Sequence, residues 1–303
     1  MIGFVNLYKE SGLTSFKNIK ILSKILNNAK VGHSGTLDPI AEGVLPVCLN
    51  EATKLASYVM AEDKDYVAGF TLGYKTDSYD VTGNTVAEGN RKVPDISEIK
   101  SVLKSLEGEI EIDIPAYSAV NINGERAYKL ARQGIIENAG TRKSRVYEIK
   151  FVDYSYPKVK IALSVEKGTY VRSIINRIGD LLGTFAVMHS LVRTKSGVFS
   201  IDNAFKTEEI MEMISKKNYG FLIPVNSVLK WSRVIVKKEF EQMVRNGVSI
   251  KLINYKYIPE DPTEMVFVTT VEGEILSIAE RHLGDIPFKN VRVFNNREFK
   301  IVE

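Results

Sequence analysis

Asp38 is the residue of this sequence whose side chain is best placed for covalent chemistry. It lies in a loop, residues 32–43, that contains three glycines and therefore allows a ligand to approach the backbone closely. Pro39 follows Asp38 directly and biases it towards an extended conformation rather than a helical one. A carboxylate on such a loop can act as a nucleophile that attacks and later leaves. The alternative is an aspartate that only caps or turns the loop.

Arg172 is the second residue of interest, because it is expected near the start of a helix. Thr169 is predicted to cap a helix that runs to Leu182, which places Arg172 in the first helical turn. The helix dipole disfavours a cation there by a few tenths to about 1 kcal/mol. Arg172 therefore needs a partner, and a carboxylate is the natural one; otherwise it is a solvated arginine. If Asp38 is that partner, Arg172 favours its ionised form and orients it.

Two further segments carry polar or aromatic residues near a predicted strand. Tyr66 begins a strand expected over 66–72 and comes shortly after Lys64. Asp77 and Asp80 lie in the polar loop that follows this strand. A strand tyrosine is more often a core residue, and an acidic loop is more often a turn. Neither segment predicts a site by itself.

Several familiar kinds of site have no counterpart in the sequence. There is one cysteine, and the three histidines are far apart, so neither a disulfide framework nor a zinc site is expected. No Gly-Lys-Ser/Thr phosphate loop, no Gly-x-Gly-x-x-Gly turn after a strand and no Gly-x-Ser-x-Gly elbow occurs. We therefore expect neither a metal nor a nucleotide cofactor.

The bulk composition describes a chain that folds in water. Of 303 residues, 44% are hydrophobic and 26% are charged, and the net charge of +4 is too small to indicate a nucleic-acid partner by itself. No apolar run approaches the length of a membrane span, and the N-terminus does not read as a signal peptide. The sequence therefore predicts a cytoplasmic protein with no membrane partner.

Hydrophobic periodicity predicts a mixture of helices and strands in two domains. Helices are expected over about 16–27, 51–60, 96–106 and 170–182, with a short helix capped by Thr207, and strands over 2–8, 44–49, 66–72, 145–153, 158–165 and 196–201. Asn123-Gly124 is the strongest hairpin signal. After Pro224 the pattern changes to short strands with one helix near 237–245. We therefore predict one domain over 1–228 and a smaller, mostly β domain over 229–303.

Together these segments resemble one family, the bacterial tRNA pseudouridine-55 synthases of the TruB type. The resemblance covers nearly the whole chain, and its most specific parts are GHSGTLDP at 32–39 and KGTYVR at 167–172. The other matching motifs are Lys9-x-x-Gly12-x-Thr14-Ser15, Lys64-x-Tyr66, Thr76-Asp77-x-x-Asp80, Pro115-x-x-Ser118-Ala119, Ala131-Arg132-x-Gly134 and Leu191-x-Arg193-Thr194. The chain departs from the usual family pattern at Glu10, Glu166 and Val192.

The resemblance implies an α+β fold. A pseudouridine-synthase catalytic domain on a curved, mainly antiparallel sheet would be followed by a small, mostly β, PUA-like domain that binds RNA. It also implies an enzyme that flips out uridine 55 in the T loop of tRNA and isomerises it to pseudouridine, with no cofactor and no metal. The partner would be the tRNA T-arm stem-loop, and the chemistry requires only a monomer.

By the same resemblance, three residues would carry the catalysis. Asp38 would be the nucleophile, and Arg172 would hold it. Tyr66 would stack on the flipped uracil and help to remove its C5 proton. Asp38 could add to C6 of the base or capture C1′ of the ribose as a retaining glycosidase does, and the sequence leaves both routes open.

Five further residues match family positions that meet the substrate. Tyr170 and Leu191 would line the uridine pocket, and His33 would support the extruded base. Lys64 would contact backbone phosphate, and Asp80 would lie near the flipped nucleotides.

Other functions of the same fold stay open at this point. The chain could be a pseudouridine synthase for another structured RNA, or a non-catalytic protein that binds or folds tRNA. Intact Asp38, Tyr66 and Arg172 argue against a non-catalytic protein. A carboxylate glycosidase would need a second acid beside Asp38, and the matched motifs offer none.

Overall fold

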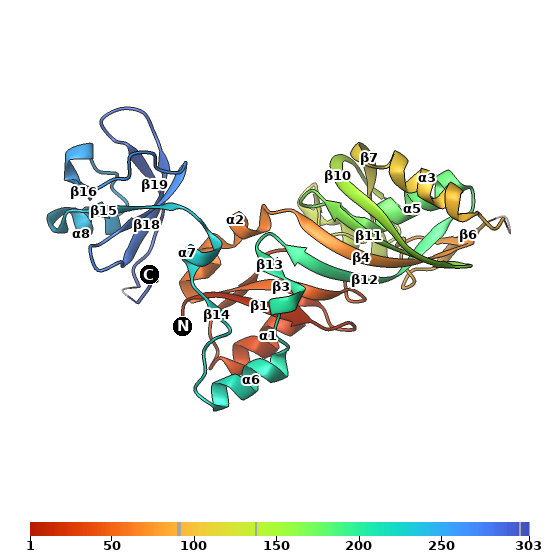
Figure 1. Ribbon diagram of the computed structural model, residues 1–303, viewed down its shortest axis with the longest axis horizontal. Coiled ribbons are helices and arrows are strands. Elements are labelled where there is room, and N and C mark those ends of the chain that lie inside the picture. Colours follow the sequence, from red (N-terminus) through yellow and green to blue (C-terminus); the bar gives the residue numbers. More distant parts are fainter. Residues whose placement is uncertain (90–91, 137, 297, 303) are drawn as a thin grey trace.

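The computed structural model describes residues 1–89, 92–136, 138–296 and 298–302, and in this part of the chain the largest element is a sheet of ten strands (Figure 1). The strand order is β14-β1-β3-β12-β4-β11-β10-β7, with β2 paired to β3 and β13 paired to β12. The bounds are β1 Gly3–Lys9, β2 Val31–His33, β3 Glu42–Leu49, β4 Lys64–Leu72, β7 Gly108–Pro115, β10 Asn138–Ser155, β11 Lys158–Val165, β12 Ala186–Ser196, β13 Phe199–Ser200 and β14 Leu222–Ile223. The expected α+β architecture on a mainly antiparallel sheet is confirmed.

One pair of neighbouring strands in this sheet runs parallel, and it joins the two halves of the sheet. β3 meets β12 over two residue pairs, Glu42–Val192 and Gly43–Arg193. The other described pairs of this sheet are antiparallel. The parallel joint places the start of β3, just after the Asp38 loop, beside the middle of β12.

Helices bury the two halves of the sheet in separate cores. Helices α3 (Ile96–Ser105) and α5 (Val171–Leu182) pack on β4, β10 and β11, and α1 (Ser15–Ile25) and α6 (Thr207–Ser215) pack on β1 and β3. Figure 1 shows these two helix pairs in different parts of the molecule. Gly183 ends α5 in the left-handed conformation that glycine adopts readily, with a φ of 67°. At its other end the first four residues of α5, Val171 to Ile174, are buried, so packing holds the first turn in place.

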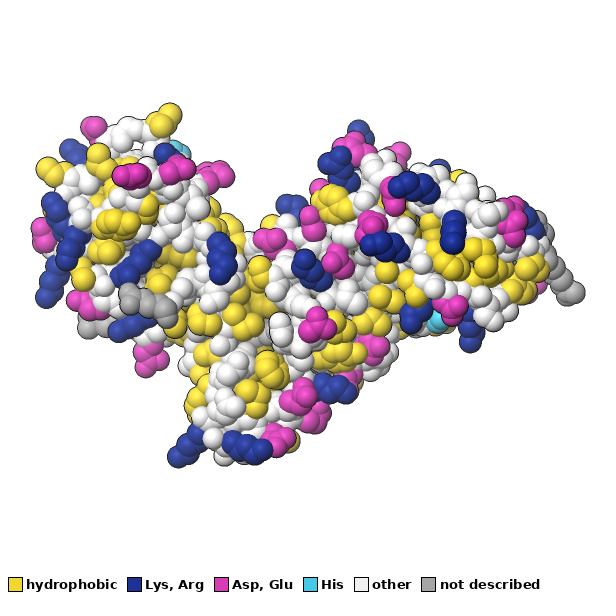
Figure 2. Space-filling view, in the orientation of Figure 1, with side chains coloured by type: hydrophobic (Ala, Val, Ile, Leu, Met, Phe, Trp, Pro, Cys, Tyr) yellow, Lys and Arg dark blue, Asp and Glu magenta, His cyan; other side chains and the backbone are white. Residues whose placement is uncertain are grey.

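The C-terminal part forms its own sheet of five strands, in the order β16-β15-β17-β18-β19. The bounds are β15 Ser232–Val236, β16 Tyr255–Tyr257, β17 Met265–Thr269, β18 Ile275–Arg281 and β19 Phe288–Val293, with helix α8 at Glu241–Arg245. Figure 2 shows this part standing across a notch from the larger part, with basic and acidic side chains interspersed on the visible face. The C-terminal part is small and mostly β, as expected. The domain boundary after residue 228 stays a prediction.

An apolar contact fixes the C-terminal part to the larger part. Trp231 lies between Tyr58 of helix α2 (Ala56–Met60) and Phe267 of β17, with ring centroids 4.8 Å and 5.2 Å apart. Phe294 and Phe299 are buried in the same cluster. The two parts therefore share a hydrophobic interface, and they are not joined by a flexible linker alone.

Most predicted elements are present, and three predictions were wrong in detail. Tyr170, one residue after Thr169, is the N-cap of α5, because the Thr169 hydroxyl donates to the Glu166 carbonyl instead. Lys206, not Thr207, is the N-cap of α6. The strand expected over 196–201 is instead the end of the long strand β12, followed by β13.

The remaining hairpins and α-helices of the described residues are short. They are the hairpins β5 (Tyr74–Thr76) with β6 (Thr85–Glu88) and β8 (Asn121–Ile122) with β9 (Glu125–Arg126), and the helices α4 (Ala127–Arg132) and α7 (Val225–Val228). The β8–β9 hairpin turns at Asn123-Gly124, both with positive φ, as its sequence predicted. Within the described ranges, no helix is both long and apolar enough to cross a membrane.

Candidate active site

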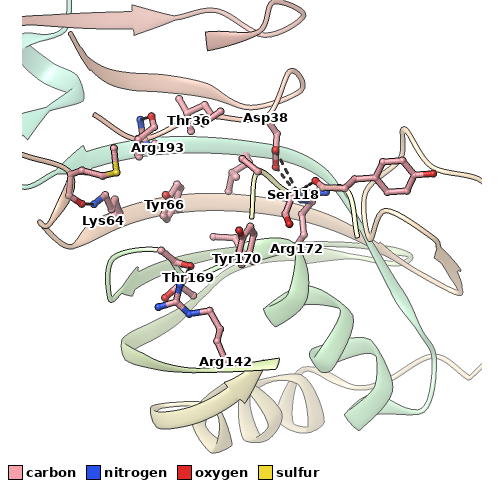
Figure 3. Close-up of a pocket in the computed structure, with 18 residues that line it drawn as sticks. Thr36, Asp38, Lys64, Tyr66, Ser118, Arg142, Thr169, Tyr170, Arg172 and Arg193 are labelled. Atoms are coloured by element: carbon pink, nitrogen blue, oxygen red, sulfur yellow. Dashed lines mark hydrogen bonds and ion pairs between the residues drawn. The ribbon is translucent and has the colours of Figure 1, made fainter. Parts of the chain in front are cut away.

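A pocket of about 330 Å³ opens between the Asp38 loop and the start of α5 (Figure 3). Six of the eight candidate residues line it, and two do not. Those that line it are Asp38, Lys64, Tyr66, Tyr170, Arg172 and Leu191. His33 and Asp80 lie outside the lining. The volume is at the lower end of the range for small-ligand sites and suits a single nucleotide better than a folded RNA segment.

The pocket draws its residues from elements that lie far apart in the sequence. Asp38 lies in the loop between β2 and β3, and Arg172 lies in the first turn of α5. Tyr66 is on β4, where it is the register partner of Arg193 on β12. In Figure 3 the rings of Tyr66 and Tyr170 lie between the Asp38–Arg172 pair and Lys64. An aromatic base that entered the pocket would therefore meet aromatic side chains next to a carboxylate.

Asp38 and Arg172 form a two-point ion pair. The Nε atom of Arg172 is 3.0 Å from Oδ2 of Asp38, and its Nη2 atom donates to Oδ1 over 3.4 Å. The Arg172 side chain is 5% exposed, whereas that of Asp38 is 34% exposed. The guanidinium is thus buried behind the carboxylate, and the carboxylate keeps an open side towards the pocket.

The rest of the Arg172 guanidinium is held by the protein. Its Nη1 atom donates to the Ser78 carbonyl (3.0 Å) and lies 3.4 Å from Oδ2 of Asp80, and its Nη2 atom donates to the Tyr117 carbonyl (3.2 Å). Asp80 in turn accepts from the Ser78 hydroxyl (2.8 Å) and the Thr82 amide (2.9 Å). Asp80 therefore positions Arg172 from the side away from the pocket. This explains why Asp80 is not among the residues that line the pocket.

The groups around Asp38 shift the pKa of its carboxyl group in opposing directions. Burial raises the pKa of Asp38, Asp80 adds to the rise, and Arg172 and Lys9 lower it, so that the net direction is upward. Arg172 does favour the ionised form, as the sequence suggested, but the cost of burial is larger. A carboxylate with a raised pKa is a stronger base and a better nucleophile once it has lost its proton.

Lys9 fixes the backbone of the Asp38 loop, a role that the sequence did not reveal. Its fully buried ammonium donates to the carbonyls of Ala41 (2.6 Å), Pro39 (3.3 Å) and Glu10 (3.1 Å). Burial lowers the pKa of Lys9 to about 8. A lysine at the end of a mostly apolar strand was the available signal.

Arg193 holds the same loop from the other side. It is 1% exposed, and it donates from Nε to the Val44 carbonyl (2.7 Å) and from Nη2 to the Gly35 carbonyl (3.1 Å). These two carbonyls flank the loop that carries Asp38. Arg193 thus ties both stems of the loop to β12, the strand that also places Leu191 in the pocket.

We expect the substitution Gly43→Ala to disturb this arrangement. Gly43 has a φ of +100°, and a Cβ atom built there would be 2.3 Å from the Arg193 carbonyl oxygen. The β3–β12 joint must therefore open, at a cost of roughly 1–3 kcal/mol in stability for a strained backbone position. Urea unfolding measures the loss of stability, and the turnover rate should fall with it. Gly12→Ala is a suitable control, since it also has a positive φ (+92°) but no atom within 4 Å of a new Cβ; equal losses in both variants would contradict the steric argument.

The contacts of Lys64 and His33 do not test the roles expected of them. The Lys64 ammonium donates to the carbonyls of Met60 (2.8 Å) and Glu62, so it faces backbone oxygens, and burial lowers its pKa to about 8. His33 is on β2, and burial lowers its pKa. Among the described residues, its Nδ1 atom is buried without a hydrogen-bond partner. A phosphate contact by Lys64 and base support by His33 stay predictions.

The described part of the chain contains no group of three or more histidine, cysteine, aspartate or glutamate side chains that could hold a metal ion. The polar atoms of the pocket are instead a carboxylate, hydroxyls and cations. These groups can supply a nucleophile, a proton acceptor and hydrogen bonds to an uncharged base.

The chain is similar in sequence and in structure to known proteins. Residues 23–171 match the model of the TruB family pseudouridylate synthase (N terminal domain). A Clostridium tetani protein named tRNA pseudouridine synthase B is 40% identical over 252 residues, which are 83% of this chain and 86% of that protein. A Clostridium acetobutylicum protein of the same name is 36% identical over 97% of this chain and 99% of its own length. Among solved structures, the crystal structure of a Cbf5-Nop10-Gar1 complex matches with a TM-score of 0.70 at 26% identity, over 98% of this chain and 86% of that one.

Proposed function

This chain belongs to the TruB family of pseudouridylate synthases, and on that premise we propose that it converts uridine 55 in the T loop of tRNA to pseudouridine. Its relatives are named tRNA pseudouridine synthase B and are matched over most of their length. The chain is accordingly an isomerase that acts on tRNA. The choice of uridine 55, and of the T arm as the part that is bound, belongs to the proposal.

One observation carries the proposed mechanism: an aspartate that is open to the pocket is held by a buried arginine beside two aromatic rings. In the reaction, the N1–C1′ bond of uridine breaks and a C5–C1′ bond forms. The proton on C5 is lost, and N1 gains one. Nothing is oxidised and no group leaves the nucleotide, so a carboxylate that adds and later departs can support the whole sequence.

Asp38 must be ionised to attack, whichever carbon it meets. Addition to C6 and capture of C1′ both use a lone pair of the carboxylate and both return it at the end. The two contacts from Arg172 leave the orientation of Asp38 little freedom. We propose that this pair holds the attacking oxygen towards the base throughout the reaction.

Tyr66 is the proposed partner of the uracil ring. It is buried on β4 and lines the pocket beside Leu191 and Tyr170. A base on this surface gains stacking energy, which offsets the few kcal/mol needed to flip it out of the loop. The phenol oxygen is the proposed acceptor, directly or through water, of the C5 proton.

We also propose that one copy of the chain is sufficient and that it works in the cytoplasm. The three residues that the proposed mechanism uses, Asp38, Tyr66 and Arg172, meet in the pocket of one chain, and the proposed chemistry uses no further residue.

The proposal is tested with a T-arm stem-loop that carries tritium at C5 of uridine 55 only. Formation of pseudouridine releases this tritium to water, so the protein should release it in an amount equal to the product. A second stem-loop, labelled at a different loop uridine, should release none. Release only from the second label would overturn the choice of uridine 55, and no release from either stem-loop or from whole tRNA would overturn the function.

The variant Tyr66→Phe separates stacking from proton transfer. It keeps the ring but removes the phenol oxygen, so we expect binding of the stem-loop to be retained and tritium release to slow by roughly 10²–10⁴-fold. Single-turnover measurements at saturating RNA report the chemical step directly. Tyr154→Phe, on β10 and outside the pocket, is the matched control. Wild-type rates in Tyr66→Phe would rule out the phenol as the proton acceptor.

A further inference from the structure

The pocket carries more positive than negative charge, although the base that is proposed to enter it is uncharged. Among the residues that the structure describes, its charged lining consists of four cations and one carboxylate, namely Lys64, Arg142, Arg172, Arg193 and Asp38. Arg172 already pairs with Asp38. In RNA, each phosphate on either side of a nucleotide carries one negative charge. The excess of cations therefore suits the backbone of the RNA better than its base.

Three of these four cations are buried and are held by the protein itself. Arg172 and Arg193 are 4% and 1% exposed, and their guanidinium groups contact carboxylates or loop carbonyls. Lys64 is 5% exposed, and its ammonium donates to two backbone carbonyls. Their contacts within the protein account for most of their hydrogen-bonding capacity.

Arg142, by contrast, is half-buried and has a donor to spare. Its Nη1 atom donates to the Gly168 carbonyl over 3.0 Å, and its Nε atom lies 3.4 Å from the Lys143 carbonyl oxygen. In the part of the chain that the structure describes, its Nη2 atom has no hydrogen-bond partner, and no carboxylate pairs with the guanidinium. Arginine presents its donors in a planar fork that matches the oxygens of a phosphate. Arg142 is therefore the lining cation best able to bind an anion from outside the protein.

The strand β10 and the turn before α5 hold the Arg142 guanidinium at the pocket. Side chains alternate along β10, and Arg142 shares its face with the buried Ser144, whose hydroxyl is hydrogen-bonded to that of Thr169. A Cβ atom built at Gly168 would be 2.7 Å from Nη1 of Arg142, so the guanidinium lies directly against the glycine backbone. Figure 3 shows Arg142 on the opposite side of the two tyrosine rings from Asp38. The cation and the nucleophile thus flank the aromatic surface.

We propose that Arg142 binds a phosphate next to the flipped uridine, with its Nη2 atom donating to a phosphate oxygen. This inference rests on the proposed function, because it takes the ligand of the pocket to be a uridine within an RNA chain. A base that stacks on Tyr66 still carries its ribose and both neighbouring phosphates, which connect it to the rest of the loop. Asp38 then meets the reacting nucleotide on one side of the rings, and Arg142 meets the RNA backbone on the other. The charge of a phosphate does not change during the isomerisation, so Arg142 contributes to binding rather than to chemistry.

The substitution Arg142→Gln should weaken binding and leave the chemical step almost unchanged. Loss of one charge-assisted contact should raise the Kd of the T-arm stem-loop, measured by filter retention, roughly 10- to 100-fold. The slope of log Kd against log salt concentration should fall by roughly 0.7–0.9, as expected for one phosphate contact. Single-turnover tritium release at saturating RNA should stay within about threefold of the wild-type rate, because the contact is equally strong before and during the reaction. Arg142→Lys keeps the charge and should restore the salt slope.

Removing the charge of the phosphate tests the contact itself. Two stem-loops each carry one uncharged methylphosphonate, either 5′ or 3′ of uridine 55, and each is compared with an RNA of the same sugars and a normal phosphate. At one of the two positions, the uncharged linkage should weaken binding by the wild type about as much as Arg142→Gln does. The same linkage should not weaken binding by Arg142→Gln any further, because the two changes remove one interaction.

The chain contains a matched control in Arg145 on the same strand. Arg145 is exposed, lies on the opposite face of β10 and does not line the pocket. Arg145→Gln removes the same charge, so any general electrostatic effect on RNA binding should appear in it as well. Each methylphosphonate should weaken binding by Arg145→Gln by the same factor as it weakens binding by the wild type.

Two results would overturn the proposal. One is a Kd of Arg142→Gln equal to that of the wild type. The other is a loss of affinity in Arg142→Gln that is the same for the normal and for both uncharged linkages, which would mean that Arg142 only holds the turn at Gly168. Failure of the proposed function is distinguishable, because the wild-type protein would then release no tritium from the stem-loop or from tRNA. Tritium release by the wild type together with either of the two results would retain the function and reject the role of Arg142.

Discussion

Substitution of Asp38 by asparagine is expected to lower tritium release from the labelled stem-loop on the order of 10⁴-fold or more. Asparagine has nearly the same shape, but its amide does not carry the lone pair of an ionised carboxylate and cannot add to the nucleotide. Binding of the stem-loop, measured by filter retention, should change little, because the stacking surface of Tyr66, Tyr170 and Leu191 stays in place.

Asp153→Asn is the control for this experiment. Asp153 is an exposed residue of β10, so the substitution alters the net charge equally and should leave the rate unchanged. Tritium release from Asp38→Asn at the wild-type rate would remove Asp38 from the mechanism. Loss of binding together with loss of release would move its role from chemistry to recognition.

Substitution of Arg172 by glutamine should affect both stability and rate. Asp80 is 3% exposed, and without the guanidinium it would keep a buried charge with no cation beside it. Removing one partner of a buried ion pair costs about 3–5 kcal/mol. The freed Asp38 would also lose its orientation, and a misplaced reacting group costs about 10²-fold in rate. Urea unfolding followed by circular dichroism and single-turnover tritium release measure the two effects.

The pH dependence of the reaction rate of Arg172→Gln gives a second, independent test. Arg172 lowers the pKa of Asp38, so its removal should raise that pKa further. A nucleophile with a higher pKa is ionised at higher pH, so the acid limb of the rate profile should move to higher pH in Arg172→Gln. Arg177→Gln, an exposed position of the same helix, should move neither the profile nor the stability. An acid limb that stays in place in Arg172→Gln would mean that Asp38 is not the titrating group.

The sequence predicted the parts of the site that depend on local structure. The glycine-rich loop placed Asp38, and the periodicity of residues 170–182 placed Arg172 in the first turn of a helix, although the cap is one residue later than expected. An unfavourable cation at a helix start was sufficient to suggest a carboxylate partner. Local rules of this kind need only a few neighbouring residues, and so they can be applied to a sequence alone.

The supports of the site depend on contacts between distant segments and could not be predicted in this way. Lys9 and Arg193 reach the Asp38 loop only because β1, β3 and β12 lie side by side in the sheet. Asp80 contacts the Arg172 guanidinium, which no local pattern indicates, and its expected place near the flipped nucleotides stays a prediction. Sequence motifs marked these positions as notable, whereas the direction in which each side chain points is set by the tertiary structure.

The position of Trp231 gives the molecule an internal optical signal. It is the one tryptophan of the sequence, and it lies between Tyr58 of the larger part and Phe267 of the C-terminal sheet. Its fluorescence therefore reports whether the two parts are docked. A shift of its emission to longer wavelength at low urea, before the main unfolding transition, would show the C-terminal part separating while the larger part stays folded.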